Sequence, residues 1–142
     1  MTDIINTIKQ VLVNNDAENV YSSFDSLPIE AKGRFFTVIG IKKLEYSKPV
    51  YSEFTIYMPF RTEIEISILA PLSTSIDKVW NYYKSKIKES IQNIAGLNTC
   101  ISDISVKQDK NISRFVLKVT ISADGIRKIE REQEEQEELS NE

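Results

Sequence analysis

The sequence contains no histidine and only one cysteine, Cys100, among its 142 residues. The absence of histidine excludes the commonest general base and every histidine-dependent catalytic triad. One cysteine cannot close an internal disulfide or complete a zinc site, which favours an intracellular, reducing origin. Because Cys100 lies at the start of an apolar, strand-like stretch, we expect it to be a buried, inert thiol.

Glycine and long apolar runs are also scarce. The chain has four glycines, and none lies in the glycine-rich pattern of a phosphate-binding loop. No stretch approaches the roughly 20 apolar residues of a membrane span. The N-terminal residues MTDIINTIKQVLV lack the basic region of a signal peptide. We therefore expect a cytosolic protein, or one assembled in the cytosol, with no membrane partner.

The charge is unevenly distributed along the chain. Residues 126–142 hold seven of the 21 acids and three of the 18 bases, which leaves 14 acids and 15 bases in residues 1–125. Such a near-neutral body lacks the clustered basic surplus of a nucleic-acid-binding domain. We predict a single domain over residues 1–125 and an acidic, helical or disordered tail over residues 126–142.

Hydrophobic periodicity predicts two amphipathic helices. Apolar residues recur every three or four positions over residues 4–12 and again over residues 76–94. Thr74 and Asp77 indicate a capped start for the second helix, and Gly96 marks its end.

Four longer stretches are rich in β-branched and aromatic residues. They are RFFTVIGIKKLEY (34–46), VYSEFTIYMPFRTEIEISILA (50–70), TCISDISVKQ (99–108) and SRFVLKVTISA (113–123). Pro59 cannot donate a ladder hydrogen bond, so it must lie at a bend, a bulge or an edge. We predict an α+β fold with an antiparallel sheet of about four strands and two helices on one side, in the order helix, hairpin, helix, hairpin. We expect residues 17–33 to form a loop.

The segment RTEIEISILAPLSTS, residues 61–75, alternates between charged or polar residues and isoleucine over residues 63–68, and it breaks at Pro71. Its isoleucines predict a core-facing side beneath the second helix. Glu63 and Glu65 share the other side and are a possible acid–base pair. Because nothing nearby suggests perturbed pKa values, we interpret them as a solvated strand face. We therefore expect no enzymatic activity, no cofactor and no metal site.

Several segments together resemble the tail terminator proteins of tailed phages and phage-derived contractile bacteriocins. These are the N-terminal helix, the strand FFTVIGIKKLEY, the run EIEISILAPLSTSIDKVWNYYKSKI and the final strand FVLKVTISADG. The resemblance covers about Thr2 to Gly125 and concerns the order and texture of the elements rather than invariant residues.

The resemblance implies a structural protein that forms a ring, usually of six subunits, caps the tail tube and ends its polymerisation. Its implied partners are other copies of itself, the tube protein, and neck, collar or sheath-end proteins, with DNA only passing through the lumen. The implied location is the tail of a virion or bacteriocin particle that is assembled in the bacterial cytoplasm. Two alternatives stay open: a head–tail connector or neck protein, and a small cytosolic domain that binds a ligand between the second helix and the sheet.

The residues themselves suggest where such a ring subunit would make contact. The hairpin over residues 34–70 is too long for a lone small sheet, and its outer part is rich in aromatics. We predict a subunit or tube interface at Tyr46, Tyr51, Phe54, Tyr57 and Phe60, while packing on the subunit's own helices is the alternative. In a ring, Glu63 and Glu65 would face the lumen or pair with a lysine of a neighbour.

Overall fold

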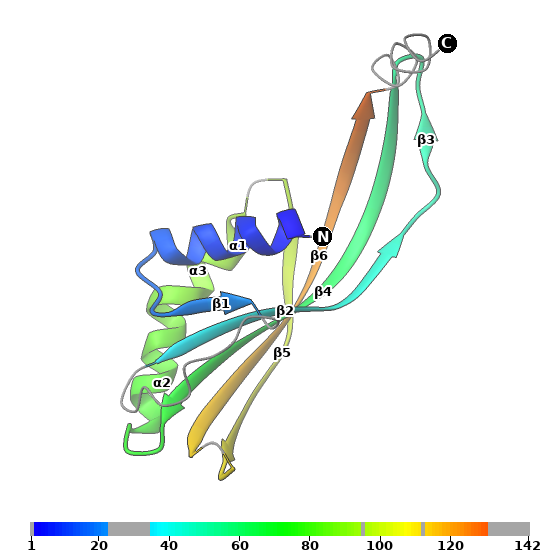
Figure 1. Ribbon diagram of the computed structural model, residues 1–142. Helices are drawn as coiled ribbons and strands as arrows, with labels where there is room; N and C mark the ends of the chain where they lie inside the picture. Colours follow the sequence, from blue (N-terminus) through cyan, green and yellow to red (C-terminus); the bar gives the residue numbers. More distant parts are fainter. Residues whose placement is uncertain (1, 23–34, 95, 112, 131–142) are drawn as a thin grey trace, which may run out of the picture.

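The computed structural model describes residues 2–22, 35–94, 96–111 and 113–130. Its elements are α1 (Thr2–Asn14), β1 (Val20–Ser22), β2 (Phe36–Tyr46), β3 (Val50–Tyr51), β4 (Thr55–Pro71), α2 (Ile76–Tyr82), η1 (Tyr83–Lys88), α3 (Glu89–Gln92), β5 (Asn98–Asp109) and β6 (Arg114–Glu130). The strands form one six-stranded sheet in the order β1-β2-β4-β6-β5, with β3 paired to β4. All the helical segments lie on one side of it (Figure 1).

The α+β class agrees with the sequence prediction, but the predicted sheet of about four antiparallel strands is wrong in two respects. The sheet has six strands, and it is mixed, because β1 runs parallel to β2 in the register Val20↔Thr37. β1 lies within the segment predicted to be a loop. β1 has three residues and β3 has two. Strands this short are invisible to a test for alternating hydrophobicity, which needs about four residues or more.

The core lies between the helices and the alternating face of β4. Ile64, Ile66 and Ile68 are at most 1% exposed, which confirms the prediction that they lie beneath the second helix. The neighbouring strand β6 and the helices supply most of the rest of this cluster, including Leu117, Val119, Ile121, Ile8, Leu12, Val79, Ile87 and Ile91. Burying each such side chain stabilises the fold by about 1.5–3 kcal/mol.

The second helix runs from Ile76 to Gln92 but is not uniform. Its N-cap is Ser75, whose hydroxyl accepts a hydrogen bond from the backbone N–H of Lys78, rather than the predicted Thr74. Six residues, Tyr83–Lys88, form a π-helix between α2 and α3. There the Asn15 side-chain amide donates to the carbonyl oxygens of Lys86 at 2.9 Å and Ser85 at 3.3 Å. These hydrogen bonds connect the turn after α1 to the π-helical part of the second helix.

Part of the sheet extends beyond the helices. Along β4, strict alternation of burial holds from Thr62 onward, whereas every residue over Thr55–Phe60 is only partly buried. Strand β5 stops pairing with β6 at Asn98↔Asp124, so β6 continues with β4 as its remaining described partner. We call residues 46–60 and 125–130 the arm; Figure 1 shows it projecting away from the helices.

Two sequence predictions bear on the arm. Pro59 lies inside β4, opposite Ile126, and its carbonyl oxygen accepts a hydrogen bond from the backbone N–H of Ser47 at 2.9 Å. β6 runs through Glu130, so residues 126–130 belong to the sheet and not to a tail beginning at 126. The prediction for the remaining tail concerns residues 131–142, which lie outside the described residues.

Candidate interaction surfaces

Exposed hydrophobic side chains gather on the arm. Five side chains there are between 49% and 65% exposed: Tyr46, Val50, Tyr51, Phe54 and Ile126. In the helix-covered body, the exposed large hydrophobic residues among those that the structure describes are Val13, Leu72 and Ile76, at 38–47%. A soluble monomer rarely leaves apolar side chains so concentrated, and such patches mark contact surfaces.

The five aromatic residues predicted for an interface all lie on the arm, in different environments. Tyr46, Tyr51 and Phe54 are exposed, and Tyr57 and Phe60 are partly buried. The Lys128 ammonium lies 6.0 Å from the centre of the Tyr57 ring. Whether these residues contact another subunit stays a prediction.

Sequence reasoning missed Val50 and Ile126, which are 57% and 63% exposed. The predicted tail includes Ile126 because few hydrophobic residues follow it. In the structure Gly125 and Ile126 continue the pairing of β6 with Phe60 and Pro59 of β4, and this long-range pairing leaves no signal in the sequence around Ile126.

At the root of the arm the surface is hollowed. This hollow has a volume of about 1170 Å³, and its lining comprises Glu45, Tyr46, Ser47, Pro59, Phe60, Arg61, Gly96, Leu97, Asn98, Asp124, Gly125 and Ile126. Residues of β2, β4 and β6 meet here with the residues that lead into β5. The hollow is therefore a surface of mixed polar and apolar character at the root of the arm.

The charged groups at the rim of the hollow are paired within the chain. Arg61 Nε lies 2.8 Å from Asp124 Oδ1, and Lys43 Nζ lies 2.7 Å from Glu45 Oε1. The hydrogen bond from Lys43 lowers the pKa of the Glu45 carboxyl and raises the pKa of Lys43. The hydrogen bond to Asp124 likewise raises the pKa of Arg61. The charged groups Glu45, Arg61 and Asp124 of the lining thus each have a partner in their own chain.

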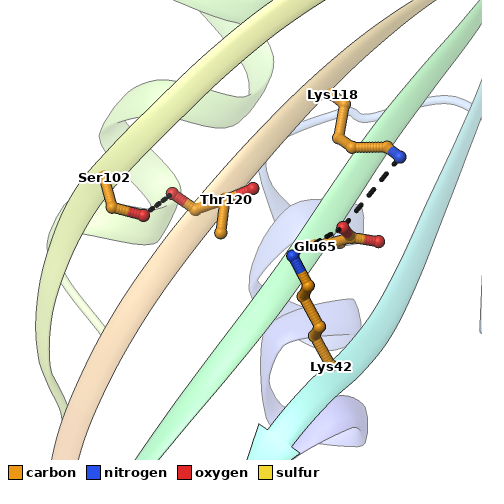
Figure 2. Close-up of polar contacts among 5 residues, drawn as sticks. All are labelled: Lys42, Glu65, Ser102, Lys118 and Thr120. Atoms are coloured by element: carbon orange, nitrogen blue, oxygen red, sulfur yellow. Dashed lines mark hydrogen bonds and ion pairs between the residues drawn. The ribbon is translucent and has the colours of Figure 1, made fainter.

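The sheet face opposite the helices is polar, and Glu63 and Glu65 lie on it. Figure 2 shows Glu65 between two lysines, with Oε1 at 3.9 Å from Lys42 Nζ and 4.0 Å from Lys118 Nζ. Beside them, the Ser102 hydroxyl donates to the carbonyl oxygen of Thr120 at 3.1 Å. Glu65 thus has cationic neighbours in its own chain, and this part of the face does not present isolated negative charge.

The remaining candidates for chemistry do not assemble into a site. Cys100 is exposed, contrary to the predicted buried thiol, because it lies opposite Ser122 on the polar face of the sheet. Within the described residues, no group of three or more potential metal ligands lies together. No helix in the described part of the chain is long and apolar enough to cross a membrane.

The space between the second helix and the sheet is filled by side chains. Val79, Tyr83, Ile87 and Ile91 are at most 3% exposed there and belong to the core cluster. This packing does not favour the alternative of a ligand pocket at that place.

Comparison with solved structures finds a similar fold in another protein. This chain is similar to the sheath/tube terminator of an extracellular contractile injection system, PVC, in its extended state, with a TM-score of 0.55 and 9% sequence identity. The match covers 91% of this chain and 56% of the terminator chain, so the present chain spans little more than half of the terminator's length. At this identity the likeness shows the fold alone.

A second similarity is weaker. The core region of PilO from the type IV pilus system of Pseudomonas aeruginosa matches with a TM-score of 0.27 and 16% identity, over 63% of this chain and 76% of that one. No family model matches the sequence, and no curated protein matches it. The fold of this chain is thus similar to that of a contractile-system sheath/tube terminator, which agrees at the level of fold with the resemblance found in the sequence.

Proposed function

We propose that this chain is the tube-terminating subunit of a contractile, phage-like particle. In this proposal several copies, usually six, form a ring on the end of the tail tube, stop its polymerisation and connect it to neck, collar or sheath-end proteins. The subunit acts by assembly and carries out no covalent chemistry. It belongs to the tail of a virion or bacteriocin particle assembled in the bacterial cytoplasm, and DNA enters only by passage through the lumen.

The observation that carries the proposal is the arm. The face of β4 that the helices bury over residues 62–70 is only partly buried over residues 55–60, and exposed hydrophobic side chains lie around that stretch. Strand ends that leave the helix layer also have unpaired edges, which soluble monomers normally protect. A subunit of a ring or tube removes both problems, because its neighbours cover the arm.

The similarity to a sheath/tube terminator supports this choice among assembly proteins. A terminator must meet copies of itself and the end of a tube, so it needs at least two contact surfaces. The arm with its hollow and the polar outer face of the sheet, which holds Glu63 and Glu65, are two such candidates. Their different chemistry suits different neighbours: an apolar contact between subunits, and a charged face toward the lumen or a neighbour's lysine.

Co-expression with the tube protein of the same particle tests the proposal. Electron microscopy of purified tubes should show rings of this protein at tube ends, and tubes should be shorter when it is present. The variant Phe54→Asp, on the arm, should lose the end rings, whereas Ile76→Asp, on the body, should keep them. Tubes of unchanged length without bound protein would refute the assignment as terminator.

A further inference from the structure

The outer end of the arm presents three exposed apolar side chains on a stiff support. Val50, Tyr51 and Phe54 are 57%, 65% and 58% exposed. We call residues 50–54 the tip. It is paired to β4 through Val50↔Tyr57 and closed by hydrogen bonds between Ser52 and Thr55, with the Ser52 N–H 2.8 Å from the Thr55 carbonyl oxygen. These bonds hold the tip against the end of β4.

The hollow at the root has the complementary form. It is concave, and the apolar residues of its lining include Tyr46, Phe60, Leu97 and Ile126. Its volume of about 1170 Å³ exceeds the roughly 300–1,000 Å³ of typical small-ligand pockets, so it has room for several side chains of a protein.

A small polar ligand fits this hollow poorly. Specific small-molecule sites depend on a few convergent polar groups that are free to bind. Here the rim charges Arg61 and Asp124 are engaged with each other, and Glu45 with Lys43. The hollow offers polar and apolar surface in nearly equal measure, which is the composition of a typical protein contact.

We propose that the tip of one copy inserts into the hollow of a second copy. This inference rests on the proposed ring function and deepens it by naming the two halves of the subunit contact. Each copy has one tip and one hollow, at different places on the arm. The contact is therefore heterologous: it propagates from copy to copy and closes into a ring when the rotation per copy permits.

The area involved predicts how strong one such contact is. If a full side chain exposes roughly 200 Å², the three tip side chains offer roughly 350 Å², and the pair of surfaces roughly 700 Å². Stable interfaces bury about 1,200–2,000 Å² in total. Two isolated copies should therefore associate only transiently, while ring closure or a tube end that holds the copies together raises the local concentration.

Disulfide trapping tests this arrangement in the full-length chain. In a Cys100→Ser background, one variant carries Glu53→Cys at the tip and the other carries Asn98→Cys at the rim of the hollow, so the apolar side chains stay intact. Both positions are exposed, as is Asn81 on α2, where Asn81→Cys provides the matched control. The mixed variants are oxidised with copper–phenanthroline, which accepts the two electrons released as each pair of thiols forms a disulfide.

The tip–hollow pair should cross-link at least about tenfold faster than the tip–control pair, because the contact raises the effective thiol concentration. A double variant with both cysteines should give a ladder of dimers, trimers and larger species. Adding Phe54→Asp to the tip variant should abolish this difference in cross-linking rate, whereas adding Ile76→Asp should not. Equal rates for the tip–hollow and tip–control pairs, with and without tubes present, would overturn the inference. If electron microscopy of the tubes from the same samples still shows rings at their ends, this inference fails but the proposed function remains supported.

Discussion

The phenyl ring of Phe60 lies directly against the backbone of Gly125, its partner across β4 and β6. A Cβ atom placed on Gly125 would come 2.6 Å from Phe60 Cζ, 2.9 Å from its Cε1 and 3.1 Å from Leu97 Cδ2. Real Cβ contacts are not that short, so only glycine allows the ring to lie flat on the sheet here. This pairing shapes the floor of the hollow at the point where the sheet leaves the helices.

Replacing Gly125 with alanine should therefore push the Phe60 ring out of its place. Because Cζ is the far end of a ring that can turn about χ1, we expect a loss of about 1 kcal/mol, the lower end of overpacking costs. Urea denaturation measures this loss, and the tip–hollow cross-linking rate should fall in the same variant.

Gly96→Ala is the control for this experiment. Gly96 has φ +80° but open space around its Cα, so its cost arises from backbone strain alone. If Gly125→Ala were as stable as the wild type and cross-linked normally, the ring would not depend on the glycine.

Asn15 gives a second prediction, because its amide donates to two carbonyl oxygens of the π-helix. Asn15→Ala removes the bonds to Lys86 and Ser85 and should cost about 1–2 kcal/mol. Hydrogen exchange in residues 85–91 should also speed up. The neighbouring Asn14 accepts an exposed bond from Gln10, and Asn14→Ala should change stability by less than about 0.5 kcal/mol. Similar small effects at both positions would show that the contact does not stabilise the helix.

Some of these features could be predicted from the sequence and others could not, for physical reasons. In a pleated strand Ile64, Ile66 and Ile68 must all point to the same face, so the core face of β4 was predictable from the sequence. The π-helix was not, because apolar residues at 83, 87 and 91 have the same spacing in an ordinary helix. Asn15 carries no signal in its neighbours, since its partners lie about 70 positions away.

The arm was predictable in part, from lengths. Seventeen residues of helix over Ile76–Gln92 span roughly 25 Å, and the seventeen residues of β4 span roughly 55 Å, so one helix cannot cover such a strand. Which aromatics end up exposed could not be derived, because residues such as Tyr51 and Tyr57 suit a strand whether covered or not. The prediction of a buried Cys100 is wrong because it relies on the apolar neighbour Ile101. Cys100 itself lies at the adjacent position of the strand, whose side chain points to the polar face of the sheet.

Two adjacent tyrosines give a third prediction. The Tyr82 hydroxyl oxygen accepts a hydrogen bond from the backbone N–H of Glu18 at 2.7 Å and lies 3.1 Å from Thr37 Oγ1. The buried Tyr83 hydroxyl has no partner among the described residues. Tyr82→Phe should therefore cost about 1–2 kcal/mol, whereas Tyr83→Phe should be neutral or slightly stabilising. Urea denaturation of both variants decides this, and an equal loss in both would contradict the assignment.

The same tyrosines predict that the free energy of unfolding decreases at alkaline pH. Burial raises the pKa of both phenols above the usual value of about 10. The unfolded chain then loses these protons at a lower pH than the folded chain does, so stability is complete below pH 10 and declines as pH rises above it. Unfolding free energies between pH 8 and about 11 should fall less steeply in the Tyr82→Phe/Tyr83→Phe variant than in the wild type. Parallel curves would show that neither phenol is shielded in the folded state.

Glu65 and its two lysines give the last prediction, which concerns stability and assembly separately. Glu65→Lys places a third ammonium group beside Lys42 and Lys118 and should cost about 1 kcal/mol at low salt, less at high salt, whereas Glu65→Gln should cost at most about half of that. The double variant Glu63→Lys/Glu65→Lys should still fold, because the helices and the core lie on the opposite face of β4. If this face lines the lumen or meets a neighbour, particles with the double variant should assemble poorly or fail to pass their cargo. Normal particles from a folded double variant would instead identify Glu63 and Glu65 as plain solvent-facing residues and leave the arm as the principal contact surface.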